Sequence, residues 1–385
     1  MGVGATVLIG QAWGAGDRDR VRLVAGSTFT AVLAGGLFIS VALTPAARPL
    51  LAAIGTPASV LPGAVAYATV ILGCMPVAFV FLLMTVLLRG IGDTVTPLWA
   101  LAISLALSMT ATPMLIGGWF GLPRLGVAAA AWGAMFAWSV SLVWLGWYLR
   151  RRNSPMAPGL PFLRAMRPNG RILLQVLRLG VPSAVQMVVM ALAEMVLLGL
   201  VNRYGPDATA AYGAVNQVMA YVQFPAMSVG ITVSILSAQS IGAGRLERLP
   251  LILRTGLLLN LILCGTLVLI AYLFSRRLVA LFIVSAPVIV LTQSLLHIVL
   301  WSVVVFGMAG ILSGQMRSSG VVLMPTLILV LSIVLVEVPV ALIGSRLIGI
   351  DGVWIAYPVT FVVMAAAQAT YFNLVWRHKP IQRLM

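Results

Sequence analysis

Charged side chains are scarce in this sequence. Asp, Glu, Lys and Arg make up 8% of its 385 residues, whereas about 25% is usual in soluble domains. Apolar residues reach 61%, compared with roughly 45 to 50% in soluble proteins. This composition excludes a soluble enzyme, a disordered tail and a fibrous repeat, and it predicts a protein whose solvent is lipid.

Acidic residues are especially few, with eight against 24 basic ones, so the net charge is +16. A basic excess can indicate nucleic-acid binding. Here, however, the arginines lie in short segments between apolar runs, as in loops that fix the orientation of a membrane protein. We therefore expect no nucleic-acid partner. Lys379 is the single lysine, so the chain has no P-loop for ATP hydrolysis.

Cysteine is also rare. Cys74 and Cys264 lie in apolar runs, and we expect both to pack as small hydrophobic residues, with no disulfide framework and no metal site. An intramembrane enzyme would need paired aspartates or a Ser/His pair at membrane depth. No apolar run contains a DxxxD pair, and His297 has no evident nucleophile partner. We expect neither enzymatic activity nor a cofactor.

Long apolar runs are what the sequence has in abundance. A bilayer core of about 30 Å needs roughly 20 residues of helix. Runs of that length cover approximately 23–46, 60–87, 95–117, 125–149, 179–201, 210–237, 251–273, 286–312, 321–343 and 353–376. The opening stretch 1–13 is apolar but reaches only half a membrane. The expected fold is an all-α polytopic membrane protein with about ten complete helices and an N-terminal half-helix.

An internal repeat organises these runs. Residues 2–23 align without gaps to residues 230–251, at an offset of 228, and later matches pair Pro113 with Pro339 and Gly126 with Gly352. The second half begins near Arg178. At an offset of 228, the matching start of the first half would lie about fifty residues before Met1. We therefore expect twelve helices in the complete fold, with the first helix and most of the second lacking here. Six helices per half make the two bundles parallel.

Basic residues assign the sides of the membrane. If successive apolar runs cross the membrane in opposite directions, 18 of the 24 basic residues fall on one face of the membrane. Basic loops are typical of the cytoplasmic side. We therefore expect this face, including the C-terminus, to be cytoplasmic and the protein to lie in the inner (plasma) membrane. The expected domains are an N-terminal lobe (1–149), a basic cytoplasmic linker (150–178) and a C-terminal lobe (179–385).

Two parallel helical bundles are typical of secondary transporters that rock around a site at the membrane midplane. An ion gradient is an adequate energy source, because one charge crossing 100 mV is worth about 2.3 kcal/mol, or roughly fifty-fold accumulation of a coupled solute. The coupling ion would be a proton or sodium.

Several segments resemble the multidrug and toxic compound extrusion (MATE) transporters. They are LIGQAWGAGDRDRVR with its second copy LSAQSIGAGRLERLP, the turn LLRGIGDTVTP, and YGPDATAAYGAVNQV with YVQFPAMSVG. The resemblance spans nearly the whole chain and is closer to the DinF-like branch than to the NorM-like one. It implies twelve helices in two lobes that export organic cations or drugs against an inward flow of protons or sodium. We expect the protein to be a monomer.

Two of the eight acids, Glu194 and Glu337, lie inside apolar runs. An aspartate at membrane depth costs about 2.5 to 3.5 kcal/mol on insertion scales, so acids there are functional candidates. We expect both to be ion-coupling sites; a carboxylate that reaches the interface or bonds a neighbour is the alternative. NorM-like members carry one acid in the seventh helix and another in the tenth. In this sequence the tenth helix corresponds to the run 286–312, which contains His297 and no acid.

Helical geometry at 100° per residue predicts which side chains share a face. On 179–201, Gln186, Met190 and Glu194 fall within about 80° and Met187 within about 100°, and on 210–237 a stripe within about 40° joins Tyr212, Asn216 and Gln223. We expect these residues and His297 to line a substrate cavity. Helix packing is the alternative, and for His297 a packed, hydrogen-bonded side chain is favoured.

Three prolines, Pro113, Pro225 and Pro339, are candidate hinges, although purely structural kinks are equally consistent with them. The alternative function is a flippase for lipid-linked saccharides of the same superfamily. Such a flippase commonly needs a cationic cavity for its diphosphate, and the arginines of this sequence are confined to loops and interfaces.

Overall fold

The computed structural model describes residues 1–121, 123–281 and 285–384, and these contain helices and no strands. Among them, nine helices are long and apolar enough to cross a membrane, and a tenth results if the bent pair 61–73 and 75–90 is one span. The two members of that pair meet at 53°. These ten segments correspond one by one to the ten apolar runs, so the expected all-α polytopic fold is confirmed.

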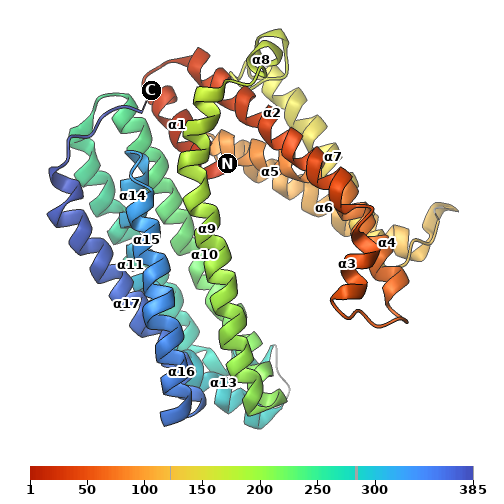
Figure 1. Cartoon of the computed structure of the whole chain (residues 1–385), viewed down its shortest axis with the longest axis vertical. Coiled ribbons are helices and arrows are strands. Elements are labelled where there is room, and N and C mark those ends of the chain that lie inside the picture. The colour runs from red at the N-terminus through yellow and green to blue at the C-terminus, as the bar shows by residue number, and fades with distance from the viewer. Residues whose placement is uncertain (122, 282–284, 385) are drawn as a thin grey trace. The chain divides into compact units, whose positions relative to one another are not determined.

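The chain divides into two compact units, Met1–Gly180 and Val181–Met385. The helices of the first unit (Figure 1) are α1 (Gly2–Gly14), α2 (Arg18–Leu43), α3 (Ala47–Ala53), α4 (Leu61–Gly73), α5 (Met75–Gly90), α6 (Val95–Gly117), α7 (Ala128–Arg151) and α8 (Leu160–Ala165). Helix α9 (Gly170–Val201) begins in this unit and continues into the next. The expected linker 150–178 thus contains the end of α7, all of α8 and the first turns of α9.

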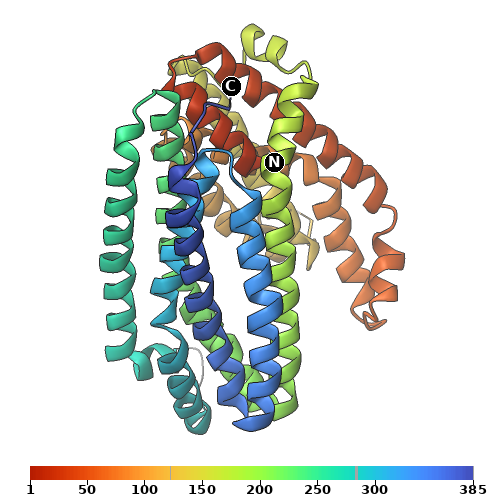
Figure 2. The same cartoon turned by 60° about the vertical axis from the view of Figure 1, so that its left-hand side comes forward.

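The second unit holds the rest of α9 and the helices that follow it. These are α10 (Pro206–Gly242), α11 (Leu249–Leu273), α12 (Ser275–Ala280), α13 (Ala286–Val299), α14 (Ser302–Ser318), α15 (Leu323–Ser332), the π-helical turn η4 (Ile333–Glu337), α16 (Val338–Leu347) and α17 (Ile350–Leu374). In Figure 2 the segment α15–η4–α16 is one continuous rod in lighter blue, so the π turn interrupts the hydrogen-bond pattern without breaking the helix.

The order and packing of the helices confirm the two repeats. Helices α2 and α11 have 26 and 25 residues and are each followed by a short helix, α3 or α12. Five helix contacts in one unit have a counterpart in the other: α1·α5 with α10·α14, α1·α2 with α10·α11, α2·α5 with α11·α14, α4·α7 with α13·α17, and α6·α7 with α16·α17. The turns agree as well, because Gly16 and Gly244 occupy equivalent positions with φ of 76° and 73°, a region that favours glycine.

The core of the second unit lies where α10, α13, α14 and α17 meet. Trp354 of α17 is fully buried there, with the ring of Tyr212 from α10 at 5.2 Å between centroids. Helices gain no hydrophobic driving force against each other in lipid, so close packing has to hold them together. This packed core fixes the positions of the side chains that α10 and α17 turn toward the site.

Candidate functional site

The local structure of Glu337 depends on a proline two residues later. Glu337 ends the π-helical turn η4, and Pro339 stands in the first turn of α16. Proline has no backbone N–H and cannot continue the regular hydrogen-bond ladder, and single π turns often occur at functional sites. Although it stands in an apolar helix, the Glu337 side chain is turned into the protein, where the residue is only 6% exposed.

Glu337 faces a cavity of about 210 Å³ inside the second unit. The cavity lies between α9, α10, α14, the α15–η4–α16 rod and α17. The residues that line it are Met190, Glu194, Asn216, Met219, Ala220, Gln223, Phe306, Leu329, Ile333, Glu337, Tyr357, Thr360, Phe361 and Met364.

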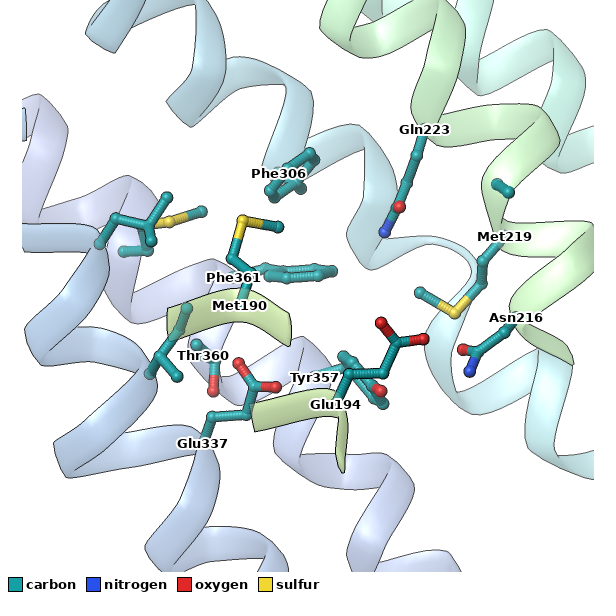
Figure 3. A pocket seen from close by; sticks show the side chains of 14 residues that line it. Met190, Glu194, Asn216, Met219, Gln223, Phe306, Glu337, Tyr357, Thr360 and Phe361 are labelled. Atoms are coloured by element: carbon teal, nitrogen blue, oxygen red, sulfur yellow. The ribbon is translucent and has the colours of Figure 1, made fainter. Parts of the chain in front are cut away.

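The polar side of the cavity carries two carboxylates and two amides. Figure 3 shows the carboxylates of Glu194 and Glu337 and the amides of Asn216 and Gln223 turned into the same space. Among the described lining residues there is no lysine, arginine or histidine. Because a charged group in a low-dielectric site needs an opposite charge or a proton, this arrangement favours a cation or protons.

The apolar side of the cavity is aromatic and methionine-rich. The rings of Phe306 and Phe361 lie 5.0 Å apart at 45°, and Met190, Met219 and Met364 line the same space. Aromatic faces attract cations, and methionine side chains adapt to ligands of different shape. The cavity therefore combines negative charge with surfaces suited to a flat organic cation.

The structure brings together five of the residues expected from the sequence. Glu194 and Met190 come from α9, Asn216 and Gln223 from α10, and Glu337 from η4. The first two lie one helical turn apart on one face, as 100° per residue predicts.

Gln186 does not line this cavity. It lies eight residues before Glu194, or about 12 Å along α9 at 1.5 Å per residue. Its side-chain oxygen accepts a hydrogen bond of 2.8 Å from Nη2 of Arg317, near the end of α14. A shared helix face was therefore too coarse a criterion, because it ignores position along the helix axis.

Tyr212 and His297 do not line the cavity either. Tyr212 is 4% exposed, and its hydroxyl lies 3.2 Å from that of Tyr357, so it stands behind the lining residues. The ring of His297 packs edge-on against Tyr272, with centroids 5.0 Å apart. His297 is nevertheless an exposed residue, so the ring contact with Tyr272 is the part of the packed alternative that the structure contains.

The three candidate hinge prolines occupy different settings. Pro113 lies inside α6 and Pro225 inside α10, and both helices continue past them. Pro339, the repeat partner of Pro113, directly follows the π turn. Of the three, it is therefore the one that stands beside an irregular stretch of helix.

Sequence reasoning missed the contribution of α17. Tyr357, Thr360, Phe361 and Met364 all line the cavity, and their spacing of three, four and seven residues places them on one helix face. That spacing was visible in the sequence. What was absent was a charged residue to distinguish this face from an ordinary packing face.

Comparison with known proteins identifies relatives along the whole chain. The family model described as MatE matches residues 1–114 and 182–343. The "Probable multidrug resistance protein YoeA" of Bacillus subtilis is 39% identical over all of this chain and 84% of its own length. The "Probable multidrug resistance protein NorM" of Thermotoga maritima is 26% identical over 96% of this chain and 79% of its own length.

Solved structures have the same fold. A structure titled "Crystal structure of MATE in complex with MaD3S" matches 97% of this chain and 82% of its own, with a TM-score of 0.88 and 20% identity. Another, titled "Outward-facing conformation of a multidrug resistance MATE family transporter of the MOP superfamily", matches with the same TM-score at 21% identity, over 97% of this chain and 82% of its own.

Proposed function

Because the chain belongs to the MatE family and is a multi-pass membrane protein, we propose that it is a secondary active multidrug exporter. It moves organic cations or drugs out of the cell in exchange for protons or sodium. The observation that supports this most directly is the convergence of Glu194 and Glu337 on one cavity with aromatic and methionine walls.

In the proposed cycle, Glu194 and Glu337 bind either a substrate cation or the coupling ions. A cation in the cavity is stabilised by both carboxylates, which are costly to leave unpaired at membrane depth. When protons or sodium ions neutralise the carboxylates, the cation loses its counter-charges and leaves. The two repeated halves of a monomer rock so that the cavity opens to each side of the inner (plasma) membrane in turn, with the C-terminus in the cytoplasm.

The internal repeat supports placing the coupling in the second half. At the offset of 226 that pairs Pro113 with Pro339, the partner of Glu337 is Ala111 and the partner of Tyr357 is Ala131. The first half therefore has alanine methyl groups at the two positions where the second half has the Glu337 carboxylate and the Tyr357 hydroxyl.

The charge of the cavity argues against the flippase alternative. A lipid-linked saccharide carries a diphosphate, which needs arginine or lysine donors. The described lining residues instead include two carboxylates and no such donor. An anionic substrate would be repelled.

The proposal is tested by ethidium efflux from cells or membrane vesicles that contain the whole chain. We expect Glu337→Gln and Glu194→Gln each to reduce the rate tenfold or more, since each removes a counter-charge while keeping the size of the side chain. The matched control is Glu247→Gln, which makes the same change in the exposed turn Leu246–Arg248 and should retain full activity. Wild-type rates in both cavity variants would refute the assignment of these residues, and no efflux by the wild type would refute the function.

A further inference from the structure

The segment 150–178, which joins the two repeats, carries charge of one sign. It contains seven arginines and no acidic residue. All seven are exposed, and we call them the linker arginines: Arg150, Arg151, Arg152, Arg164, Arg167, Arg171 and Arg178. The ion pairs in the described part of the chain are those of Arg20 with Asp17 and of Arg22 with Asp19. Within that part, the linker arginines therefore have no carboxylate partner.

The middle of this segment is held in a fixed place on the first unit. Phe162 of α8 is buried, and its ring packs edge-on against Phe29 of α2, with centroids 5.8 Å apart. The hydroxyl of Thr30, also in α2, donates a hydrogen bond of 2.7 Å to the backbone oxygen of Met166. Because these contacts fix the inner face of α8, they also fix the direction of its outer face.

The outer face of α8 is both apolar and basic. Leu160 and Leu163 are 72% and 58% exposed. At 100° per residue, these two leucines and Arg164 fall within about 100° of one another, on the side away from Phe162. Exposed leucines are unfavourable in water. Beside a bilayer, leucines can contact the acyl chains while arginines reach the headgroups.

The end of α7 has the side chains typical of a membrane interface. The guanidinium carbon of Arg151 lies 4.1 Å from the centre of the Trp147 ring, and that of Arg152 lies 5.1 Å from the centre of the Tyr148 ring. Tryptophan and tyrosine are enriched at the level of the lipid headgroups. Figure 1 shows the end of α7, α8 and the start of α9 at the same end of the first unit.

The position of the segment in the chain also places it at the membrane surface. Helices α7 and α9 are both long and apolar enough to cross a membrane. The residues between them therefore lie next to the headgroups, on the side that its arginines predict to be cytoplasmic. Anionic lipids give the cytoplasmic leaflet a negative surface potential, so the linker arginines face the charge that they lack in the protein.

We propose that the linker arginines, together with Leu160 and Leu163, form a docking surface for anionic phospholipids of the cytoplasmic leaflet. Guanidinium groups bind the headgroup phosphates, which they can contact through two parallel hydrogen bonds, and the two leucines contact the acyl chains. A phospholipid satisfies the charge and the apolar surface together. This inference goes beyond the proposed export activity and does not depend on the exported substrate.

The test is lipid binding to the purified full-length protein in an uncharged detergent, measured by native mass spectrometry. Phosphatidylglycerol and phosphatidylcholine with the same acyl chains are compared. Each arginine near an anionic surface strengthens binding about fivefold, so phosphatidylglycerol should bind about tenfold more tightly than phosphatidylcholine, or better. Arg164→Gln combined with Arg167→Gln should remove most of this preference. Leu163→Ser should weaken both lipids by a similar factor and leave the preference intact.

The matched control is Arg20→Gln combined with Arg22→Gln. It removes the same charge from the same unit, but these two arginines already have aspartate partners at 3.3 and 2.7 Å, so the preference should be retained. Equal affinity of the wild type for the two lipids would refute the proposal, as would an equal loss in the control. Displacement of the lipid by inorganic phosphate would indicate a free-phosphate site instead, and displacement by polyglutamate would indicate a site for acidic proteins. Ethidium efflux is not measured here, so a failure of the proposed function would leave these results unchanged.

Discussion

The crossing of α10 and α14 allows a sharp test of how the second unit is held together. A Cβ atom added at Gly314 of α14 would lie 2.5 Å from the backbone oxygen of Gly230 in α10. Ordinary van der Waals contact begins at 3.4 Å, so the helices would have to separate by about 0.9 Å. Because the obstacle is backbone, no side-chain rotation relieves it. We therefore expect Gly314→Ala to destabilise the unit.

Gly310, one turn earlier on α14, is a matched control. A Cβ atom added there would have nothing within 4 Å. Both variants gain the same helix propensity, about 1 kcal/mol for alanine over glycine, so this contribution cancels between them. What remains is the cost of overpacking at Gly314, about 1 to 3 kcal/mol. Gly310→Ala should be as stable as the wild type or more stable.

Cys264 provides the assay, because it is fully buried in α11 of the same unit and reacts with a fluorogenic maleimide only on unfolding. Cys74, which is partly exposed, is first replaced by alanine so that the signal reports the second unit. At roughly 2 to 4 °C per kcal/mol for a unit of this size, Gly314→Ala should melt about 2 to 12 °C below Gly310→Ala. Equal melting temperatures would refute the reasoning.

Two further predictions concern side-chain hydrogen bonds. Asp93 accepts hydrogen bonds from the backbone nitrogen and the hydroxyl of Thr96 at 3.0 and 2.6 Å, at the start of α6. Asp93→Ala should cost about 1 kcal/mol and Asp93→Asn less, measured as the shift of the thermal unfolding transition by circular dichroism. Trp376 donates to the hydroxyl of Ser319 at 2.9 Å and stacks on Phe372 at 4.8 Å. Trp376→Phe keeps the ring stack but removes the hydrogen bond, and it should cost about 1 kcal/mol of stability. Adding Ser319→Ala to this variant should then lower the melting temperature little further. If the effects of the two substitutions on the melting temperature are instead fully additive, the hydrogen bond contributes nothing.

Much of the fold could be predicted because lipid imposes a simple rule on the sequence. Every spanning segment must satisfy its backbone hydrogen bonds within a helix, so ten apolar runs are sufficient to identify ten segments. The repeat was equally visible, since matching glycines such as Gly16 and Gly244 are required by equivalent turns. Even the bent pair α4–α5 was found as one apolar run, but its bend of 53° was not.

The candidate site was only partly predictable. An acid in an apolar helix is conspicuous, and Glu194 and Glu337 were therefore singled out. The polar faces of α9 and α10 were also visible, yet Gln186 bonds Arg317 and Tyr212 lies behind the cavity wall. The periodicity of one helix shows which residues share a face, but it does not show at which height a neighbouring helix opens a cavity.

Composition and periodicity were thus enough to establish the membrane environment, the helices, the duplication and the two acids, because each of these follows from local chemistry along one segment. The convergence of Glu194, Asn216 and Glu337 on one space, and the pairing of Tyr212 with Tyr357 across 145 residues of sequence, depend on how helices distant in the chain pack together. Packing sets the height, rotation and spacing of each helix relative to its neighbours, and no single segment contains that information.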